Sequence, residues 1–247
     1  MILGRDVHLH AACFDEIATA VDQLLVDAGD PRTVAFNAHA FPDRVAPDAI
    51  VYNYENVDVQ VSGSAFVDNE IWDFSERNAA RWRDRRRAVR HVPAGYHPSM
   101  ERFKPLPWSE RDVDVVFAGC MNPRRQRVLE ALGHYGLKTM VLSTAYGPER
   151  DKMLARAKLA VNMLFYEEGT FAVLRTAHCA ANALPVVSEA ANEAPPWAYP
   201  APVTYDQIVD ACRELLASGE EKLAETATEA LRRFREHPLK LPPRAGS

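Results

Sequence analysis

The sequence lacks the signals of several large protein classes. It has four cysteines among 247 residues and no CxxC pair, which argues against a zinc ribbon, a redox motif or a disulfide framework. It contains no apolar run near the eighteen or so residues that a transmembrane helix requires. It also contains no glycine-rich loop of the GxGxxG or GxxxxGK type, which argues against a dinucleotide oxidoreductase or a P-loop enzyme.

The remaining composition is that of an ordinary globular protein. Hydrophobic residues make up 47% and charged residues 26% of the chain, and the formal net charge is −5, so the chain as a whole has no basic excess. Arg5 and Asp6 stand where a secretion signal would have its apolar core. We therefore expect a cytoplasmic protein, long enough for one large domain or two small ones.

The second half of the sequence alternates between strand and helix signals. Between short buried strands, helices are expected, and this alternation predicts βαβ units with a parallel sheet. The predicted strands cover 114–118, 138–142, 159–164 and 184–188, and the predicted helices cover 124–132, 149–157, 173–182, 208–217 and 223–236.

The first half is less regular. Its patterns predict helices over 14–28 and 70–87 and strands over 33–37 and 49–53. A proline-rich stretch follows and should be extended. The predicted division is a small N-terminal domain over 1–96, a linker over 97–107, a C-terminal domain over 108–237 and a tail over 238–247.

An anion-binding site is predicted where the strand 114–118 ends. Gly119 would let a ligand approach the backbone, and the turn Asn122-Pro-Arg-Arg125 opens the next helix. Arg124 and Arg125 oppose the dipole at that helix N-terminus, and an anion would favour them there. Backbone N–H groups and guanidinium forks suit a diphosphate, although a pair of solvated arginines is the simpler alternative.

Other candidate residues stand near the ends of the neighbouring predicted elements. Tyr146 and Gly147 follow the second strand and either edge a base-stacking pocket or serve packing. Asn162 ends a buried strand and needs a polar partner, and Arg175 is a charge in a mostly apolar helix. Glu189 follows the last strand at the carboxyl edge, where α/β sheets bind ligands, so it is a candidate for a ribose contact or for capping a helix.

Several segments resemble, in their order and spacing, the GT-B glycosyltransferases that have a group-1-like C-terminal domain. The parallels are Phe117-Ala-Gly-Cys-Met-Asn-Pro-Arg-Arg125, Tyr146-Gly-Pro-Glu-Arg-Asp151, Ala157-Lys-Leu-Ala-Val-Asn162, Leu184-Pro-Val-Val-Ser-Glu189, Tyr52-Asn-Tyr-Glu55 and Ile71-Trp-Asp-Phe-Ser-Glu-Arg-Asn78. The resemblance implies an α/β fold of two Rossmann-like domains, here with a reduced N-terminal half. It also implies that the C-terminal domain binds a nucleotide-sugar and that the N-terminal domain presents the acceptor.

From this resemblance we expect a glycosyltransferase that moves a sugar from a nucleotide-diphosphate sugar, its substrate, to an acceptor. No metal or other cofactor is expected, because arginines and a helix N-terminus can neutralise the leaving diphosphate. An inverting reaction needs a base, for which Glu55 and His97 are candidates and Asp73 is a third.

Two features keep a different function open. His178 stands where many retaining members of the resembled group carry a glutamate, and the N-terminal domain is short for a Rossmann half. A non-catalytic nucleotide-sugar-binding or partner module is therefore the alternative, and a homodimer would complete the short half. Whether the reaction retains or inverts the sugar configuration stays open.

Further patterns suggest other partners. His8-Leu-His10 places two imidazoles on one strand face, as in some metal-dependent hydrolases, although a histidine pair without metal is the simpler interpretation. The segment Arg81-Trp-Arg-Asp-Arg-Arg-Arg-Ala-Val-Arg90 either receives an anionic acceptor, with Trp82 stacking on a base or sugar, or is a solvated helix end. Asp112-Val-Asp114 matches the D-x-D of metal-dependent GT-A enzymes but precedes its strand, so it is not assigned as a metal site.

Overall fold

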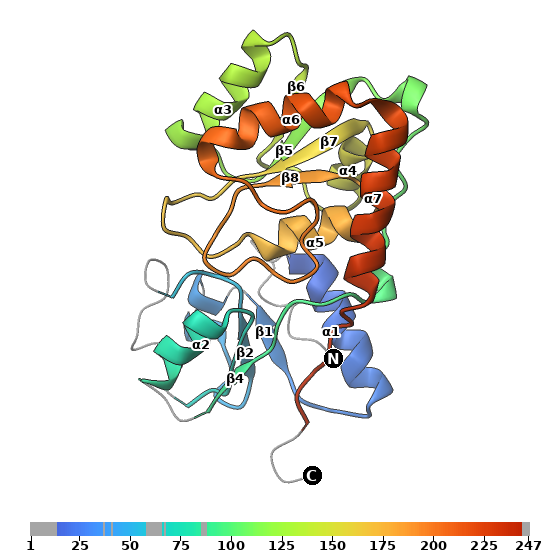
Figure 1. Ribbon diagram of the computed structural model, residues 1–247. Helices are drawn as coiled ribbons and strands as arrows, with labels where there is room; N and C mark the ends of the chain where they lie inside the picture. Colours follow the sequence, from blue (N-terminus) through green and yellow to red (C-terminus); the bar gives the residue numbers. More distant parts are fainter. Residues whose placement is uncertain are drawn as a thin grey trace. The chain divides into compact units, whose positions relative to one another are not determined.

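The computed structural model describes residues 14–36, 38–40, 42–57, 66, 68–84 and 88–243. The chain forms two compact units, which are called the N-terminal unit (Met1–Ala94 with Leu239–Ser247) and the C-terminal unit (Gly95–Pro238). Each contains its own four-stranded parallel sheet with helices packed on it (Figure 1).

The sheet of the C-terminal unit has the strand order β6-β5-β7-β8, and every neighbouring pair is parallel. The strands are β5 (Val113–Ala118), β6 (Thr139–Leu142), β7 (Ala157–Asn162) and β8 (Val186–Ser188). Because β5 is followed by β6 on one side and β7 on the other, the chain reverses its direction of winding between β5 and β7. Ligands of open α/β sheets bind at such a switch point, outside the carboxyl ends of the strands.

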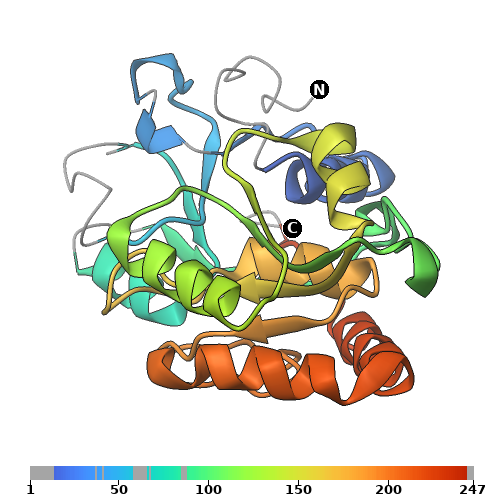
Figure 2. The same ribbon diagram turned by 90° about the horizontal axis from the view of Figure 1, so that it is seen from above.

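Helices cover both faces of this sheet. They are α3 (Pro123–His134), α4 (Gly147–Leu154), α5 (Val173–Ala181), α6 (Ile208–Ala217) and α7 (Gly219–Arg235). Val115 and Phe117 pack on one face with α3 and α6, whereas Val116 and Ala160 pack on the other with α4 and α5. Figure 2 shows α4 and α6 on opposite sides of the unit.

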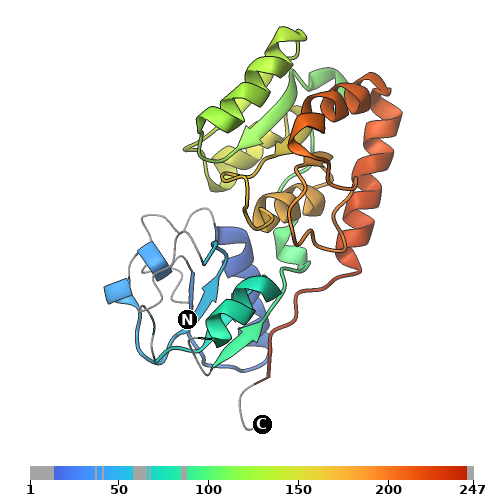
Figure 3. The ribbon, with the colours of Figure 1, turned by 60° about the vertical axis from the view of Figure 1, so that its left-hand side comes forward.

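The N-terminal unit is smaller and has the strand order β1-β2-β3-β4, again all parallel. Its elements are α1 (Asp15–Asp27), β1 (Val34–Phe36), β2 (Ile50–Asn53), β3 (Ile71–Asp73), α2 (Glu76–Arg83) and β4 (Val89–His91). Helix α2 packs against β3 and β4 (Figure 3) and buries Trp82 among Ala35, Val51 and Ile71. Short 3-10 helices lie in the loops of the chain, at Ala38–Ala40, Pro42–Arg44, Pro98–Met100, Trp108–Glu110 and Tyr205–Gln207.

The predicted helix over 70–87 is wrong in its first part. Residues 71–73 form β3, and α2 begins only at Glu76, where Ser75 accepts a hydrogen bond from the Asn78 N–H (3.1 Å) as a helix N-cap. Ile71 and Trp72 are both buried, as expected for a parallel strand that is covered on both faces. Such a continuous apolar run carries no alternation by which the sequence could separate it from a buried helix. Strand β4 was not predicted.

The segment predicted as a linker lies within the C-terminal unit, and the chain from Leu239 onward lies with the N-terminal unit. In the latter, Leu239 is buried and Arg32 Nη2 donates to the Pro242 carbonyl (3.0 Å). No helix in the described ranges combines the length and the apolarity needed to cross a bilayer.

One buried amide attaches the proline-rich segment to α5. Asn182 Oδ1 accepts from the N–H groups of Arg102 (2.6 Å) and Phe103 (2.8 Å), while Nδ2 donates to the carbonyls of Met100 (3.0 Å) and His178 (2.8 Å). All four hydrogen-bonding positions of this side chain are therefore used. Asn182 therefore adds side-chain partners to the few backbone hydrogen bonds of this segment, among them Tyr96 N–H to the His237 carbonyl (2.8 Å) and Leu106 N–H to the Ala155 carbonyl (2.8 Å).

We expect Asn182→Ala to lower the free energy of unfolding by roughly 2 to 4 kcal/mol, because it leaves several backbone groups without partners. Urea unfolding followed by circular dichroism measures the change. Asn192→Ala, at an exposed position, is the control and should stay within about 0.5 kcal/mol of the wild type. Equal losses in the two variants would contradict the role given to Asn182.

Candidate nucleotide-sugar site of the C-terminal unit

The turn after β5 begins with a glycine that another side chain requires. Gly119 has φ +149°, and a Cβ built on it would lie 2.6 Å from Arg175 Nη2. Its N–H donates to the Leu142 carbonyl of β6 (2.9 Å), so the turn is fixed to the neighbouring strand. Gly119 therefore allows a guanidinium to pack closely against the backbone, at a positive φ that residues with a side chain rarely adopt.

Arg175, in the first turn of α5, connects the ends of β5 and β7. Its Nε donates to the Ala118 carbonyl, its Nη1 donates to Asn162 Oδ1 (2.5 Å), and its guanidinium lies 4.9 Å from the centre of the Phe117 ring. Burial lowers the pKa of Arg175 to about 9, so the group is still charged at neutral pH. Within the described residues Nη2 has no hydrogen-bond partner and remains available at the Gly119 turn.

Arg125 makes a second bridge across the switch point. Its three guanidinium nitrogens donate to the carbonyls of Leu164 (3.2 Å), Cys120 (2.6 Å) and Met163 (2.6 Å), and the residue is only 4% exposed. Burial lowers its pKa to about 10. The guanidinium therefore holds the loop after β7 against the turn after β5, a role that no local sequence signal predicts.

Arg124 forms an ion pair with Glu189, the residue after β8. The fork is bidentate, with Nη1 at 2.7 Å from Oε2 and a second, shorter bond from Nη2 to Oε1, and the guanidinium stacks on Tyr205 (3.8 Å). Glu189 is 3% exposed and also accepts from the Leu164 N–H (2.8 Å). The hydrogen bonds that Arg124 donates to Glu189 hold the pKa of Arg124 above its ordinary value. A ligand that bound to Glu189 would have to share this carboxylate with Arg124 or displace the ion pair.

Asn122 fixes the start of α3. Its Oδ1 accepts from the Arg125 N–H (2.9 Å) as the helix N-cap, Pro123 follows at the first helical position, and Nδ2 donates to the Phe165 carbonyl (2.7 Å). The backbone N–H groups of Cys120 and Met121 donate to no group in the described part of the chain. The turn thus presents free donors beside the positive end of a helix.

Two buried polar atoms at the strand ends have no partner. Asn162 and Ser188 are paired in register on β7 and β8, and Asn162 is 0% exposed. Asn162 Nδ2 and Ser188 Oγ form no hydrogen bond in the described residues. Buried polar groups are rarely left unpaired, and a bound ligand or water would satisfy both. Ser188 was not among the predicted site residues, because a serine in an apolar strand gives no signal.

Tyr146, Gly147 and His97, which were also predicted, lie outside the turn after β5 and the ends of β7 and β8. Tyr146 caps α4 and is 43% exposed, and Gly147 begins that helix with φ +54°. Both follow β6, which lies on the side of β5 opposite β7. His97 is the N-cap of a 3-10 helix, and its Nδ1 lies 2.8 Å from Ser99 Oγ.

Glu55 belongs to the N-terminal unit, at the end of β2. Its backbone is held by Asn53, whose Oδ1 accepts from the Glu55 N–H (3.2 Å), and by Asn78 Nδ2, which donates to the Glu55 carbonyl (2.9 Å). Burial raises the pKa of the Glu55 carboxyl to about 7. The group therefore titrates in the range that suits a general base.

Asp73 is 0% exposed and accepts from Asn53 Nδ2 (2.7 Å), the Ser75 N–H (2.9 Å) and Trp82 Nε1 (3.0 Å). Burial raises its pKa to about 7, and these hydrogen bonds act in the opposite direction. Asp73 holds Asn53, and Asn53 holds the turn at Glu55. This favours a supporting role for Asp73 over contact with an acceptor.

The arginine-rich segment is partly paired. Arg83 forms an ion pair with Glu76, and Arg90 forms one with Glu70 (2.8 Å). The suggestion that Trp82 stacks on a ligand is wrong, because its ring is fully buried under α2 and its indole N–H is bonded to Asp73. His8 and His10 lie outside the described residues.

His178, which the sequence placed at a glutamate position, is buried in the C-terminal unit. Its Nε2 lies 2.8 Å from Asp151 Oδ1, and Arg150 Nη2 lies 3.1 Å from the same oxygen. Arg102 completes the set with an Nε to Asp151 Oδ2 distance of 3.3 Å. The imidazole therefore joins α5 to α4 through Asp151, and the same carboxylate joins α4 to Arg102 of the extended segment.

Comparisons with known proteins agree with this architecture. The crystal structure of TarM matches 83% of the chain and 51% of its own length, with a TM-score of 0.53 and 13% identity. An alpha-glucosyltransferase solved with UDP and a 13-mer DNA containing a HMU base matches 83% of the chain and 76% of its own length, with a TM-score of 0.54 and 10% identity. No protein-family model matches the chain.

Among curated sequences, uncharacterized protein L140 of Acanthamoeba polyphaga mimivirus is 30% identical over 128 residues. That match covers 48% of this chain and 40% of the viral protein, so the chain corresponds to less than half of this relative. The structural likenesses show the fold. The chain has a GT-B-like α/β fold of two Rossmann-like units with a reduced N-terminal half, and the predicted fold class is confirmed.

We expect Gly119→Ala to destabilise the C-terminal unit by about 1 to 3 kcal/mol, because the added methyl group displaces Arg175 from its carbonyl partners. Thermal or urea unfolding gives the value. Gly133→Ala is the matched control: this glycine lies within α3 with nothing near a new Cβ, so alanine should be neutral or stabilise by about 0.5–1 kcal/mol. A neutral Gly119→Ala would contradict the close packing.

Proposed function

We propose that this protein transfers a sugar from a nucleotide-diphosphate sugar to an acceptor, without a metal ion, and that the C-terminal unit binds the donor. The observation that carries the proposal is the group of unsatisfied donors at the switch point between β5 and β7. Arg175 Nη2 and the N–H groups of the turn after Gly119 are donors that suit phosphate oxygens. Asn162 Nδ2 and Ser188 Oγ add polar atoms that lack partners.

The donor diphosphate would lie over the Gly119 turn, with Arg175 and the start of α3 neutralising its charge as the bond to the sugar breaks. Glu189 would bind the ribose. Its carboxylate accepts three hydrogen bonds, two from Arg124 and one from Leu164, and a carboxylate has about four acceptor positions. One position is then left for a ribose hydroxyl, and Arg124 keeps the charge of Glu189 balanced.

UDP is the first nucleotide to test, because the alpha-glucosyltransferase with a similar fold was solved with UDP. At the acceptor side, Glu55 is the base we propose for an inverting reaction. It lies at the carboxyl end of β2, and its burial brings its pKa close to neutrality.

Thermal unfolding with UDP, GDP, ADP, CMP and dTDP tests the donor site. One nucleotide should stabilise the wild type, by roughly 2.7 kcal/mol at a hundred times its Kd, and the effect should be absent in Arg175→Ala. Arg127→Ala, on the exposed side of α3, is the control and should keep the full response. A wild type that responds to none of the five nucleotides would overturn the donor site.

If Glu55 is the base, transfer should fall as the pH drops through about 7, because a base acts only when deprotonated. Glu55→Gln should slow transfer by about 10²- to 10⁴-fold and remove the dependence on this group, while the Kd for the nucleotide stays the same. Initial rates between pH 5.5 and 8.5 decide the matter. An unchanged profile in Glu55→Gln would assign the base to another group.

A binding module without transfer activity is the second candidate. It is favoured by His178, which occupies the glutamate position and is engaged with Asp151 inside the unit. Nucleotide-dependent stabilisation together with no transfer and no slow hydrolysis of the matching nucleotide-sugar would establish this alternative.

A further inference from the structure

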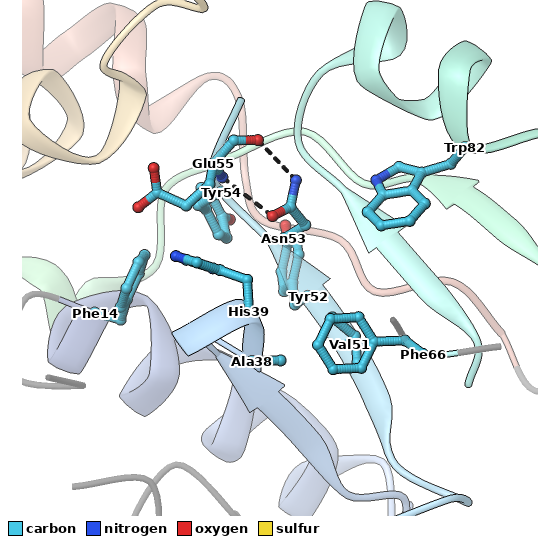
Figure 4. Close-up of a pocket in the computed structure, with 10 residues that line it drawn as sticks. All are labelled: Phe14, Ala38, His39, Val51, Tyr52, Asn53, Tyr54, Glu55, Phe66 and Trp82. Carbon is cyan, nitrogen blue, oxygen red and sulfur yellow. Dashed lines mark hydrogen bonds between the residues drawn. The ribbon is translucent and has the colours of Figure 1, made fainter. Parts of the chain in front are cut away.

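The N-terminal unit contains a small, largely enclosed pocket at the carboxyl end of β2 (Figure 4). Its free volume of about 10 Å³ suits a single water-sized group. Aromatic side chains make up much of its wall: Phe14, Tyr52, Tyr54, Phe66 and Trp82. The surroundings of this volume are therefore mostly apolar ring faces and edges.

The charged group in this wall is negative and has no cationic partner. Glu55 lines the pocket, and in the described part of the chain its side chain forms no ion pair. Asp73 lies directly behind the wall, bonded to the lining residues Asn53 and Trp82, and within the described ranges it also has no lysine or arginine partner. Among the residues that the structure describes, two carboxyl groups thus share one small region without a compensating positive charge.

The other titratable side chains of the described wall, His39, Tyr52 and Tyr54, do not supply that charge. His39 lies at the same end of the pocket as Phe14 and Glu55 (Figure 4), and burial lowers its pKa below the ordinary histidine value. It is therefore neutral near pH 7 and can accept a hydrogen bond through a ring nitrogen. Tyr52 and Tyr54 keep their protons, because burial raises both phenol pKa values.

We propose that this pocket binds the ammonium head of a primary amine. An –NH₃⁺ group has about the size of a water molecule, carries three donors, and is attracted both by a carboxylate and by aromatic ring faces. Water would fit the same volume but would leave the charge of Glu55 uncompensated. An anion would meet two carboxyl groups, and a quaternary ammonium group would exceed the free volume.

Burial of an unpaired carboxyl disfavours its ionised form, which is the cause of the raised Glu55 pKa. A bound ammonium reverses this effect, because an opposite charge in contact favours the ionised form. Ammonium binding uses none of the residues proposed to hold the donor, but it uses Glu55, which is also the proposed base, so a bound ammonium would compete with the acceptor for this carboxylate.

The test is a titration with methylammonium at pH 8, where Glu55 is ionised, followed by the NMR signal of the Trp82 indole N–H. The wild type should show a saturable shift. Methanol, a neutral molecule of the same size, should give none at equal concentration, and neither should sodium. Glu55→Gln should weaken methylammonium binding at least tenfold.

Glu55→Gln is a suitable variant because the hydrogen bonds of Glu55 to Asn53 and Asn78 use its backbone, so the turn is expected to persist. Asp48→Asn, at an exposed position of the same unit, controls for general charge effects and should bind like the wild type. Equal shifts with methanol, unchanged binding in Glu55→Gln, or no saturable shift in the wild type would each overturn the proposal and leave a pocket for water. Because nucleotide stabilisation is measured separately, that result would not affect the donor site.

Discussion

The C-terminal unit depends on two guanidinium groups that join the carboxyl ends of β5 and β7. Parallel strands that lead to opposite sides of a sheet leave their carbonyls and loops unpaired at the point where they diverge. Arg125 fills that gap with three bonds to backbone carbonyls, and Arg175 fills it with bonds to Ala118 and Asn162. A hydrogen bond to a charged group contributes about 1.5–3 kcal/mol. These bridges therefore stabilise the loops that carry the residues of the candidate nucleotide-sugar site.

The same bridges divide the arginines by role. All three guanidinium nitrogens of Arg125 donate to backbone carbonyls, and Arg124 forms an ion pair with Glu189. Arg175 keeps one nitrogen that has no partner among the described residues. Fewer arginines are therefore available to bind an anion than the sequence alone suggests. The N-terminal unit presents the opposite case, since the carboxyls of Glu55 and Asp73 have no cationic partner among the described residues. The two units thus carry unsatisfied charge of opposite sign.

Much of the fold could be predicted because its signals are local. Apolar strands alternating with amphipathic helices indicated the parallel sheet of the C-terminal unit, and each of its strands and helices was found within a few residues of its predicted place. The prediction failed at β3, where Ile71 and Trp72 are buried on both faces and the periodicity that separates strand from helix is lost. It also missed β4, whose residues Val89, Arg90 and His91 form no apolar run and are at most partly buried.

The sequence by itself determined the fold class and the carboxyl-edge position of the candidate site, since both follow from the order of elements and from polar residues at strand ends. Only the tertiary structure decided what each polar side chain does. Arg124 and Arg125 are adjacent and chemically identical, yet one pairs with a carboxylate 65 residues away and the other with carbonyls 38 and 39 residues away. Such partners come together only when the chain folds, and the desolvation that sets the pKa of Glu55 arises only there.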